Sequence, residues 1–186
     1  MQIYIITFNS QNDKVVRTAR HWIGSHKLPD LIAFEQGSKI VSTDITSPVN
    51  MWPKPEDGCA LYLISHGNSQ GILGGDGKLH NNPNAFLGSH QGLKAVYEKA
   101  SKVALVSCSN ADEAGLLLSS AGKMGFQAST FATNLKNVDK KKNVVAAVGP
   151  VIMNDGNNEQ GGMKVQLPGG IDGAVYASAQ GWKQIN

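Results

Sequence analysis

A histidine and a cysteine each stand at the end of an apolar run. His66 directly follows the run 59–65, CALYLIS, and Cys108 ends the run 103–108, VALVSC. Continuous apolar runs of this length are typical of strands buried on both faces. If the two strands are parallel neighbours, both side chains reach the same edge of the sheet, which is where open α/β sheets bind ligands. There the imidazole could activate the thiol as a nucleophile.

The surroundings of Cys108 predict acyl-transfer chemistry. Its thiol has two candidate activators, His66 and the N-terminus of a helix predicted to begin near Asn110, whose dipole favours a thiolate. The backbone N–H groups of Gly67 and Cys108 are candidates for an oxyanion hole, because Gly67 has no Cβ and can approach a carbonyl closely. Each such donor is worth on the order of 3 kcal/mol.

The other cysteine and histidines fit this chemistry less well. Cys59 begins its strand, at the wrong edge of the sheet, and is predicted to be a core residue. Neither cysteine lies in a CxxC pair, so no metal site is expected. His21 and His26 lie far upstream of the site. His80 and His90 could line the cleft, although both are predicted to be surface residues.

The remaining elements follow from apolar periodicity and turn residues. Asp13 is predicted to cap a helix that runs to about Ile23. Strands are predicted at 2–8 and 126–132, and a hairpin or a pair of short strands at 30–34 and 38–43. Helices are predicted at 90–100 and 110–122, a surface connection at 44–58, and a loop at 68–88. The runs 144–153 and 163–167 predict an exposed C-terminal hairpin.

This alternation predicts an α/β fold, with a mostly parallel central sheet and helices on both faces. The glycine-rich part of the loop, 71–77, is expected to be mobile and to wall a substrate cleft together with the C-terminal hairpin. At 186 residues the chain is expected to form a single domain, 1–186.

The composition of the chain argues against two classes of binding partner, nucleic acids and membranes. A net charge of +3 is too small for a nucleic-acid binder, and the apolar runs are too short to span a membrane. The N-terminus lacks the features of a Sec signal peptide. We therefore expect a protein that is cytoplasmic, or secreted by a route without a Sec signal, with no nucleic-acid or membrane partner. A nucleotide-binding domain is disfavoured, because no GxGxxG follows the first strand and no GxxxxGK[ST] occurs.

The blocks LYLISHG (61–67) and ALVSC (104–108) resemble those of the caspase-like cysteine peptidases, in which a hydrophobic strand ends in His-Gly and a later one ends in Cys. The resemblance implies a caspase-like three-layer sandwich, a catalytic dyad of His66 and Cys108, and an oxyanion hole from Gly67 and Cys108. It is closest in style to the self-processing domains of bacterial toxins, whose inositol phosphate ligand implies such an activator here. Lys140, Lys141 and Lys142 are predicted to lie in a solvated loop and would be the candidates to bind it. No other cofactor is expected.

The expected function is that of a cysteine endopeptidase (thiol protease), which cleaves a protein or peptide through a thioester acyl-enzyme. The expected setting is a bacterial effector or toxin. Two alternatives stay open: a non-catalytic binding module on the same scaffold, and an amidase or acyl transferase with the same dyad. The sequence does not locate the substrate-binding residues.

The two cysteines should respond in opposite ways to replacement by alanine. Cys108→Ala should abolish activity and leave folding intact, whereas Cys59→Ala should keep activity and lose about 1–2 kcal/mol of stability from a small core cavity. Peptide turnover and urea unfolding measure the two effects. Equal loss of activity in both variants would contradict the assignment.

Overall fold

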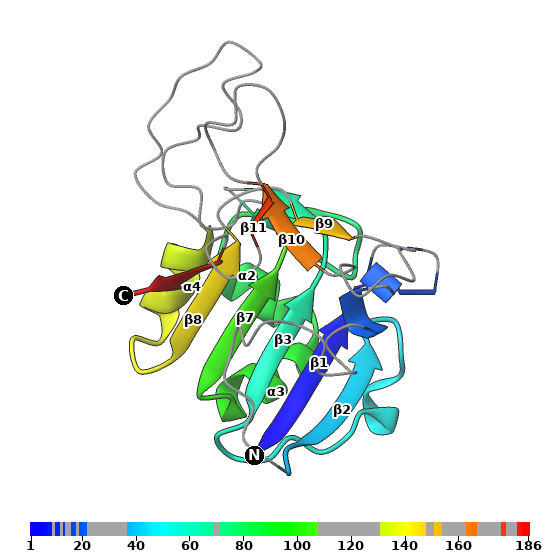
Figure 1. Cartoon of the computed structure of the whole chain (residues 1–186). Coiled ribbons are helices and arrows are strands. Elements are labelled where there is room, and N and C mark those ends of the chain that lie inside the picture. Colours follow the sequence, from blue (N-terminus) through cyan, green and yellow to red (C-terminus); the bar gives the residue numbers. More distant parts are fainter. Residues whose placement is uncertain are drawn as a thin grey trace.

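The apolar runs at 2–8, 59–65 and 103–108 correspond to adjacent strands of one central sheet (Figure 1). The structure is a computed structural model. It describes residues 1–8, 10, 11, 13, 16, 17, 19–21, 37–68, 71–107, 131–147, 151–153, 163–166, 176–177 and 182–186. The predicted elements at 30–34 and 110–122 lie outside these residues.

Within the described residues the central sheet has six strands, in the order β12-β8-β7-β3-β1-β2. These are β1 (Gln2–Thr7), β2 (Lys39–Asp44), β3 (Ala60–Ile64), β7 (Lys102–Val106), β8 (Asn143–Ala147) and β12 (Trp182–Ile185). Strands β8, β7, β3, β1 and β2 are all parallel to one another, and β12 pairs antiparallel with β8. The predicted mostly parallel sheet is therefore confirmed.

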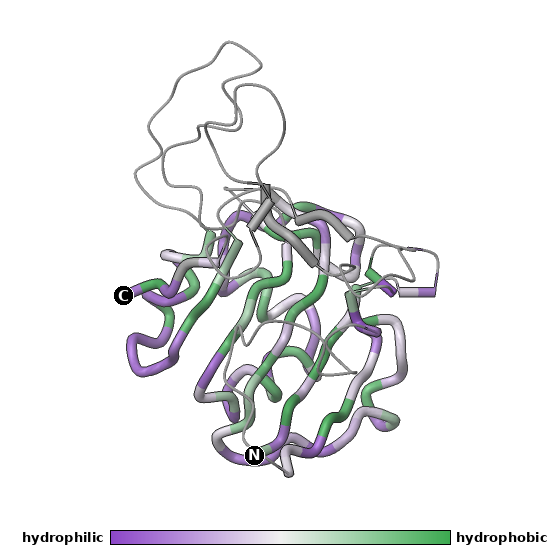
Figure 2. The backbone as a smooth tube through the Cα atoms, in the orientation of Figure 1, coloured by the Kyte–Doolittle hydropathy of each residue, from purple (hydrophilic) through white to green (hydrophobic). Residues whose placement is uncertain are grey.

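Helical residues cover both faces of this sheet. Side chains such as Leu61 and Leu105 pack on one face against α2 (Pro83–Gly88), α3 (Gln91–Lys99) and α4 (Phe131–Val138). On the other face Ile5, Tyr62 and Ile64 pack against Val16 and Ala19 of the helical turns after Asp13. Because the central strands β1, β3 and β7 alternate their side chains between two buried faces, they are almost entirely apolar, as Figure 2 shows for the middle of the sheet.

The predicted loop at 68–88 is wrong, because this segment holds regular structure. Strands β4 (Gly67–Asn68), β5 (Gly71–Leu73) and β6 (Leu79–His80) form a small antiparallel sheet, and α2 follows. Ile72 is fully buried and anchors this sheet in the core. A Cβ on Gly71 would lie 2.5 Å from the His80 carbonyl oxygen, so glycine permits the close approach of β5 and β6. The glycines that suggested a mobile loop therefore serve a tight hairpin.

Two predictions in the last third also need correction. Phe131 and Ala132 begin α4 rather than end a strand, and 126–130 lie outside the described residues. Strand β8 is a buried strand of the central sheet and not an arm of an exposed hairpin. The antiparallel pairing of the later segments is confirmed. It joins β9 (Val151–Met153) to β10 (Met163–Gln166), with β11 (Tyr176–Ala177) on the far side of β10.

Lys142 is not the exposed loop residue that the sequence predicts. Its side chain is buried, and its ammonium donates to the carbonyl oxygens of Ala100 at 2.6 Å and Glu98 at 3.4 Å. The same ammonium pairs with Asp139 at 3.4 Å and lies over the Tyr97 ring. Lys142 therefore joins the end of α3 to the start of β8 and is not available to an external anion.

The connection between β2 and β3 contains a short 3-10 helix, η1 (Val49–Met51). Trp52, which follows it, stacks on His90 at the start of α3. In the described part of the chain, no helix combines the length and the apolar character needed to cross a membrane.

Replacing Lys142 by methionine should destabilise the fold, because the carbonyl oxygens of Ala100 and Glu98 would lose a buried charged donor. We expect a loss of about 1–3 kcal/mol in the free energy of unfolding, measured with urea. Lys141→Met is the matched control: its side chain is exposed, so its change should stay within about 0.5 kcal/mol. Equal stability of the two variants would show that the Lys142 contacts contribute nothing.

Candidate active site

The carboxyl ends of β1, β3 and β7 lie side by side. Ile64, the last residue of β3, pairs with Thr7 of β1 and with Val106 of β7. The Ser65 N–H continues the ladder by donating to the Val106 carbonyl at 3.2 Å. His66 follows at this edge, as the sequence predicts. Cys108 lies outside the described residues. It is the second residue after Val106, just as His66 is the second residue after Ile64.

The imidazole of His66 meets an acidic partner at this edge. Its Nε2 lies 2.5 Å from Oδ2 of Asp13, and the two side chains are 51% and 22% exposed. A carboxylate only accepts hydrogen bonds, so Nε2 carries the proton in the neutral ring and Nδ1 carries the lone pair. Among the described residues, Nδ1 has no hydrogen-bond partner. The pair therefore presents a basic nitrogen whose tautomer and orientation are set from the opposite side of the ring.

Asp13 also begins the helix that packs on the second face of the sheet. Its Oδ1 accepts from the Val16 backbone N–H at 3.1 Å, and its carbonyl accepts from the Arg17 N–H at 3.0 Å. The predicted cap is confirmed, but the contact with His66 was not predicted. A signal for it did exist: Asp13 lies in the segment after β1, and neighbouring parallel strands deliver such segments to one edge.

A second carboxylate, Asp44 at the end of β2, is buried beside the turn that leads to Asp13. Its Oδ2 accepts from the Thr7 hydroxyl at 2.8 Å and from the Ser10 N–H and hydroxyl at 2.8 and 2.7 Å. Its Oδ1 accepts from the Thr46 N–H and hydroxyl at 3.1 and 2.7 Å. Burial raises the pKa of the Asp44 carboxyl, but the hydrogen bonds from Ser10, Thr46 and Thr7 outweigh it and lower the pKa to about 2.

Gly67, the predicted oxyanion donor, begins the small sheet. The Leu73 N–H donates to the His66 carbonyl at 2.8 Å, and Gly67 is paired with Ile72. Hydrogen-bonded and non-hydrogen-bonded pairs alternate along an antiparallel ladder, so the Gly67 N–H points away from β5. This donor is therefore not used by the pairing with β5.

His80 and His90 are held in structural contacts. The Nε2 of His80 lies 2.9 Å from Asp76 Oδ1, and its ring meets the Phe86 ring edge-on. His90 caps α3, since its Nδ1 accepts from the Leu93 N–H at 3.4 Å, and burial lowers its pKa. Both side chains are partly buried, contrary to the predicted surface positions. His21 is exposed on its helix, and His26 lies outside the described residues.

Cys59 is a core residue, as predicted. It lies directly before β3 and is 1% exposed. Burial raises the pKa of its thiol to about 11, so it is protonated at neutral pH and a poor nucleophile.

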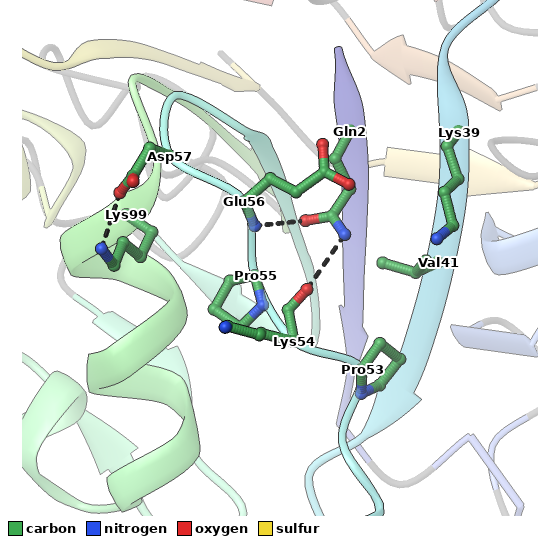
Figure 3. Close-up of a pocket in the computed structure, with 9 residues that line it drawn as sticks. All are labelled: Gln2, Lys39, Val41, Pro53, Lys54, Pro55, Glu56, Asp57 and Lys99. Carbon is green, nitrogen blue, oxygen red and sulfur yellow. Dashed lines mark hydrogen bonds and ion pairs between the residues drawn. The ribbon is translucent and has the colours of Figure 1, made fainter.

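A hollow of about 710 Å³ opens at the opposite, amino edge of the sheet (Figure 3). Gln2 of β1 closes one side by bonding to the Lys54 carbonyl and the Glu56 N–H, and Lys99 pairs with Asp57 at 2.6 Å. No histidine or cysteine is among the described residues that line it. His66 and Asp13 lie at the other, carboxyl edge.

The described residues contain no cluster of three or more His, Cys, Asp or Glu side chains that could hold a metal ion. Comparison with known proteins gave no match, either to a protein-family model or to a curated protein.

The low pKa of Asp44 predicts how stability depends on pH. The carboxyl is harder to protonate in the folded chain than in the unfolded chain, where its pKa is about 3.9. Its contribution, about 2 kcal/mol, is therefore present above pH 4 and is lost as the pH falls from about 4 to 2. Urea unfolding of the wild type and of Asp44→Asn should differ most at neutral pH and converge in acid. A difference that is constant with pH would contradict this.

Proposed function

We propose that this chain is a cysteine endopeptidase of the caspase-like type, with Cys108 as nucleophile and His66 as general base and acid. The observation that carries the proposal is the Asp13–His66 pair at the carboxyl edge of β3. Strand β7, which Cys108 follows, is the next strand of the same sheet. The parallel sheet with helices on both faces also supports the caspase-like fold.

In the proposed acylation step, Nδ1 of His66 takes the proton of the Cys108 thiol. The thiolate attacks the carbonyl carbon of the scissile peptide, and the N–H groups of Gly67 and Cys108 stabilise the oxyanion that forms. The tetrahedral intermediate collapses as the carbon–nitrogen bond breaks, and the leaving amine takes the proton from Nδ1. The product that stays on the enzyme is a thioester at Cys108.

Deacylation reverses the proton movements. Water gives a proton to Nδ1 of His66 while its oxygen attacks the thioester carbonyl, again with the oxyanion at the two N–H groups. The carbon–sulfur bond then breaks and releases the carboxylic acid, and the thiolate recovers the proton from His66. The proposed steps use only the chain's own residues, the substrate and water.

Asp13 strengthens His66 in both steps. Its carboxylate accepts the Nε2–H bond, which holds the ring with Nδ1 toward the nucleophile and stabilises the imidazolium that forms beside the thiolate. Because the pair is partly exposed to solvent, we expect a contribution through orientation more than through charge.

The exposure of His66 favours a polymeric substrate. The side chain is 51% exposed, which fits a site that an extended peptide reaches. An amidase or acyl transferase would use the same residues, and a binding module would not need an activated thiol. Profiling cleavage of a peptide library, with Cys108→Ala as the inactive control, separates these functions.

Replacing the two partners of the pair tests the mechanism. His66→Ala should lower kcat/KM by about 10²–10⁴, because the general base is lost. Asp13→Asn should lower it less, about 10–100-fold, while asparagine keeps the helix cap and the stability.

Asp57→Asn is the matched control for Asp13→Asn. It removes the carboxylate that pairs with Lys99 at the amino edge of the sheet, which is not part of the proposed mechanism. Turnover of the best library peptide should be unchanged in this variant. If Asp13→Asn and Asp57→Asn behave alike, Asp13 has no catalytic role; if Cys108→Ala still cleaves the peptide, the chain is not this peptidase.

A further inference from the structure

The turn after β1 connects two carboxylates. Ser10 donates both its backbone N–H and its hydroxyl to Oδ2 of the buried Asp44. Three residues later Asp13 places its own Oδ2 against Nε2 of His66. Ser10, which is bound to Asp44, is therefore only three residues from Asp13. Three residues of chain can span about 10 Å at most.

The residues at the end of β1 are held by hydrogen bonds to both neighbouring strands. Thr7 donates its hydroxyl to Asp44, and its carbonyl accepts from the Ile45 N–H at 2.8 Å. On the other side the Phe8 N–H donates to the Ile64 carbonyl at 3.0 Å. Thr7 and Phe8 are therefore held between β2 and β3, and Ser10, three residues before Asp13, is held to Asp44 at the end of β2.

The donors of Asp44 fall into two groups. Thr7 and Ser10 belong to the chain that leads to Asp13 and bind Oδ2, whereas Thr46 lies beyond β2 and binds Oδ1. A purely stabilising role would make the two groups interchangeable. A positioning role would make only the first group matter to His66.

We propose that Asp44 is a positioning residue: it anchors Ser10 and thereby sets Asp13 against the imidazole of His66. The inference rests on the proposed function, in which His66 activates Cys108. A displacement of about 1 Å in a catalytic group can cost up to 10²-fold in rate, so a rigid anchor one short turn away has a direct effect on activation. Asp44 acts through Asp13 and does not contact the reacting atoms.

Ser10→Ala and Thr46→Ala form a matched pair for the test. Each removes one hydroxyl that donates to Asp44 at 2.7 Å, and each leaves the backbone N–H of the same residue in place. Both should fold, which thermal melting checks. The readout is the rate at which iodoacetamide alkylates Cys108 at pH 6, followed by mass spectrometry of the peptide that contains it. This rate reports thiol activation and requires no knowledge of the substrate.

We expect Ser10→Ala to slow this alkylation by about threefold or more and Thr46→Ala to leave it unchanged within about 1.5-fold. In the Asp13→Asn background, Ser10→Ala should slow it no further, because its effect passes through Asp13. Equal rates for Ser10→Ala and Thr46→Ala, or an equal slowing by Ser10→Ala with and without Asp13, would overturn the positioning role.

The same measurements separate this inference from the proposed function. If His66→Ala leaves the alkylation rate of Cys108 unchanged, the proposed activation fails, and the positioning role fails with it. If His66→Ala and Asp13→Asn both slow alkylation but Ser10→Ala does not, only the role of Asp44 is rejected.

Discussion

The parallel pairing of β1 with β3 and of β3 with β7 is the constraint on which the candidate site depends. Parallel strands end at one edge, so three segments that are far apart in sequence begin there together. One carries Asp13, one carries His66 and Gly67, and one leads to Cys108. The pairing is stable because both faces of the strands are covered, by α2, α3 and α4 on one side and by the helical turns after Asp13 on the other.

Two buried charges join the connections at opposite edges of this sheet. Asp44 lies at the carboxyl edge and accepts hydrogen bonds from three residues, and Lys142 lies at the amino edge and donates to the carbonyls of Ala100 and Glu98. A buried charge is costly unless hydrogen bonds replace its water. Asp44 and Lys142 therefore each favour one conformation of the chain around them. At the carboxyl edge, that conformation includes the contact of Asp13 with His66.

The described residues also show how burial separates reactive groups from inert ones of the same type. Cys59 is enclosed before β3, and its thiol pKa is raised to about 11. His80 and His90 are partly buried in contacts with Asp76 and Trp52. The His66 side chain, by contrast, is half exposed and is hydrogen-bonded to the carboxylate of Asp13. Position relative to the edge of the sheet, more than residue type, decides which group is suited to chemistry.

The sequence by itself determined the features that depend on local pattern. Apolar runs predicted β1, β3 and β7, and their unbroken character predicted a parallel sheet covered on both faces. The residue type and position of Asp13 predicted a helix cap, and the place of Cys59 at the start of a strand predicted burial.

Only the tertiary structure decided the contacts between distant residues. Asp13 and His66 are 53 positions apart, and Ser10 and Asp44 are 34 apart, so no periodicity links them. Lys142 looked like one of three solvated lysines until packing placed it under α3. The segment 68–88 looked like a loop because its glycines permit a tight hairpin as readily as an open chain, and the burial of Ile72 selected the hairpin. Local patterns determine which elements form, whereas the partners of polar side chains are set by strand order and register, which exist only in the folded chain.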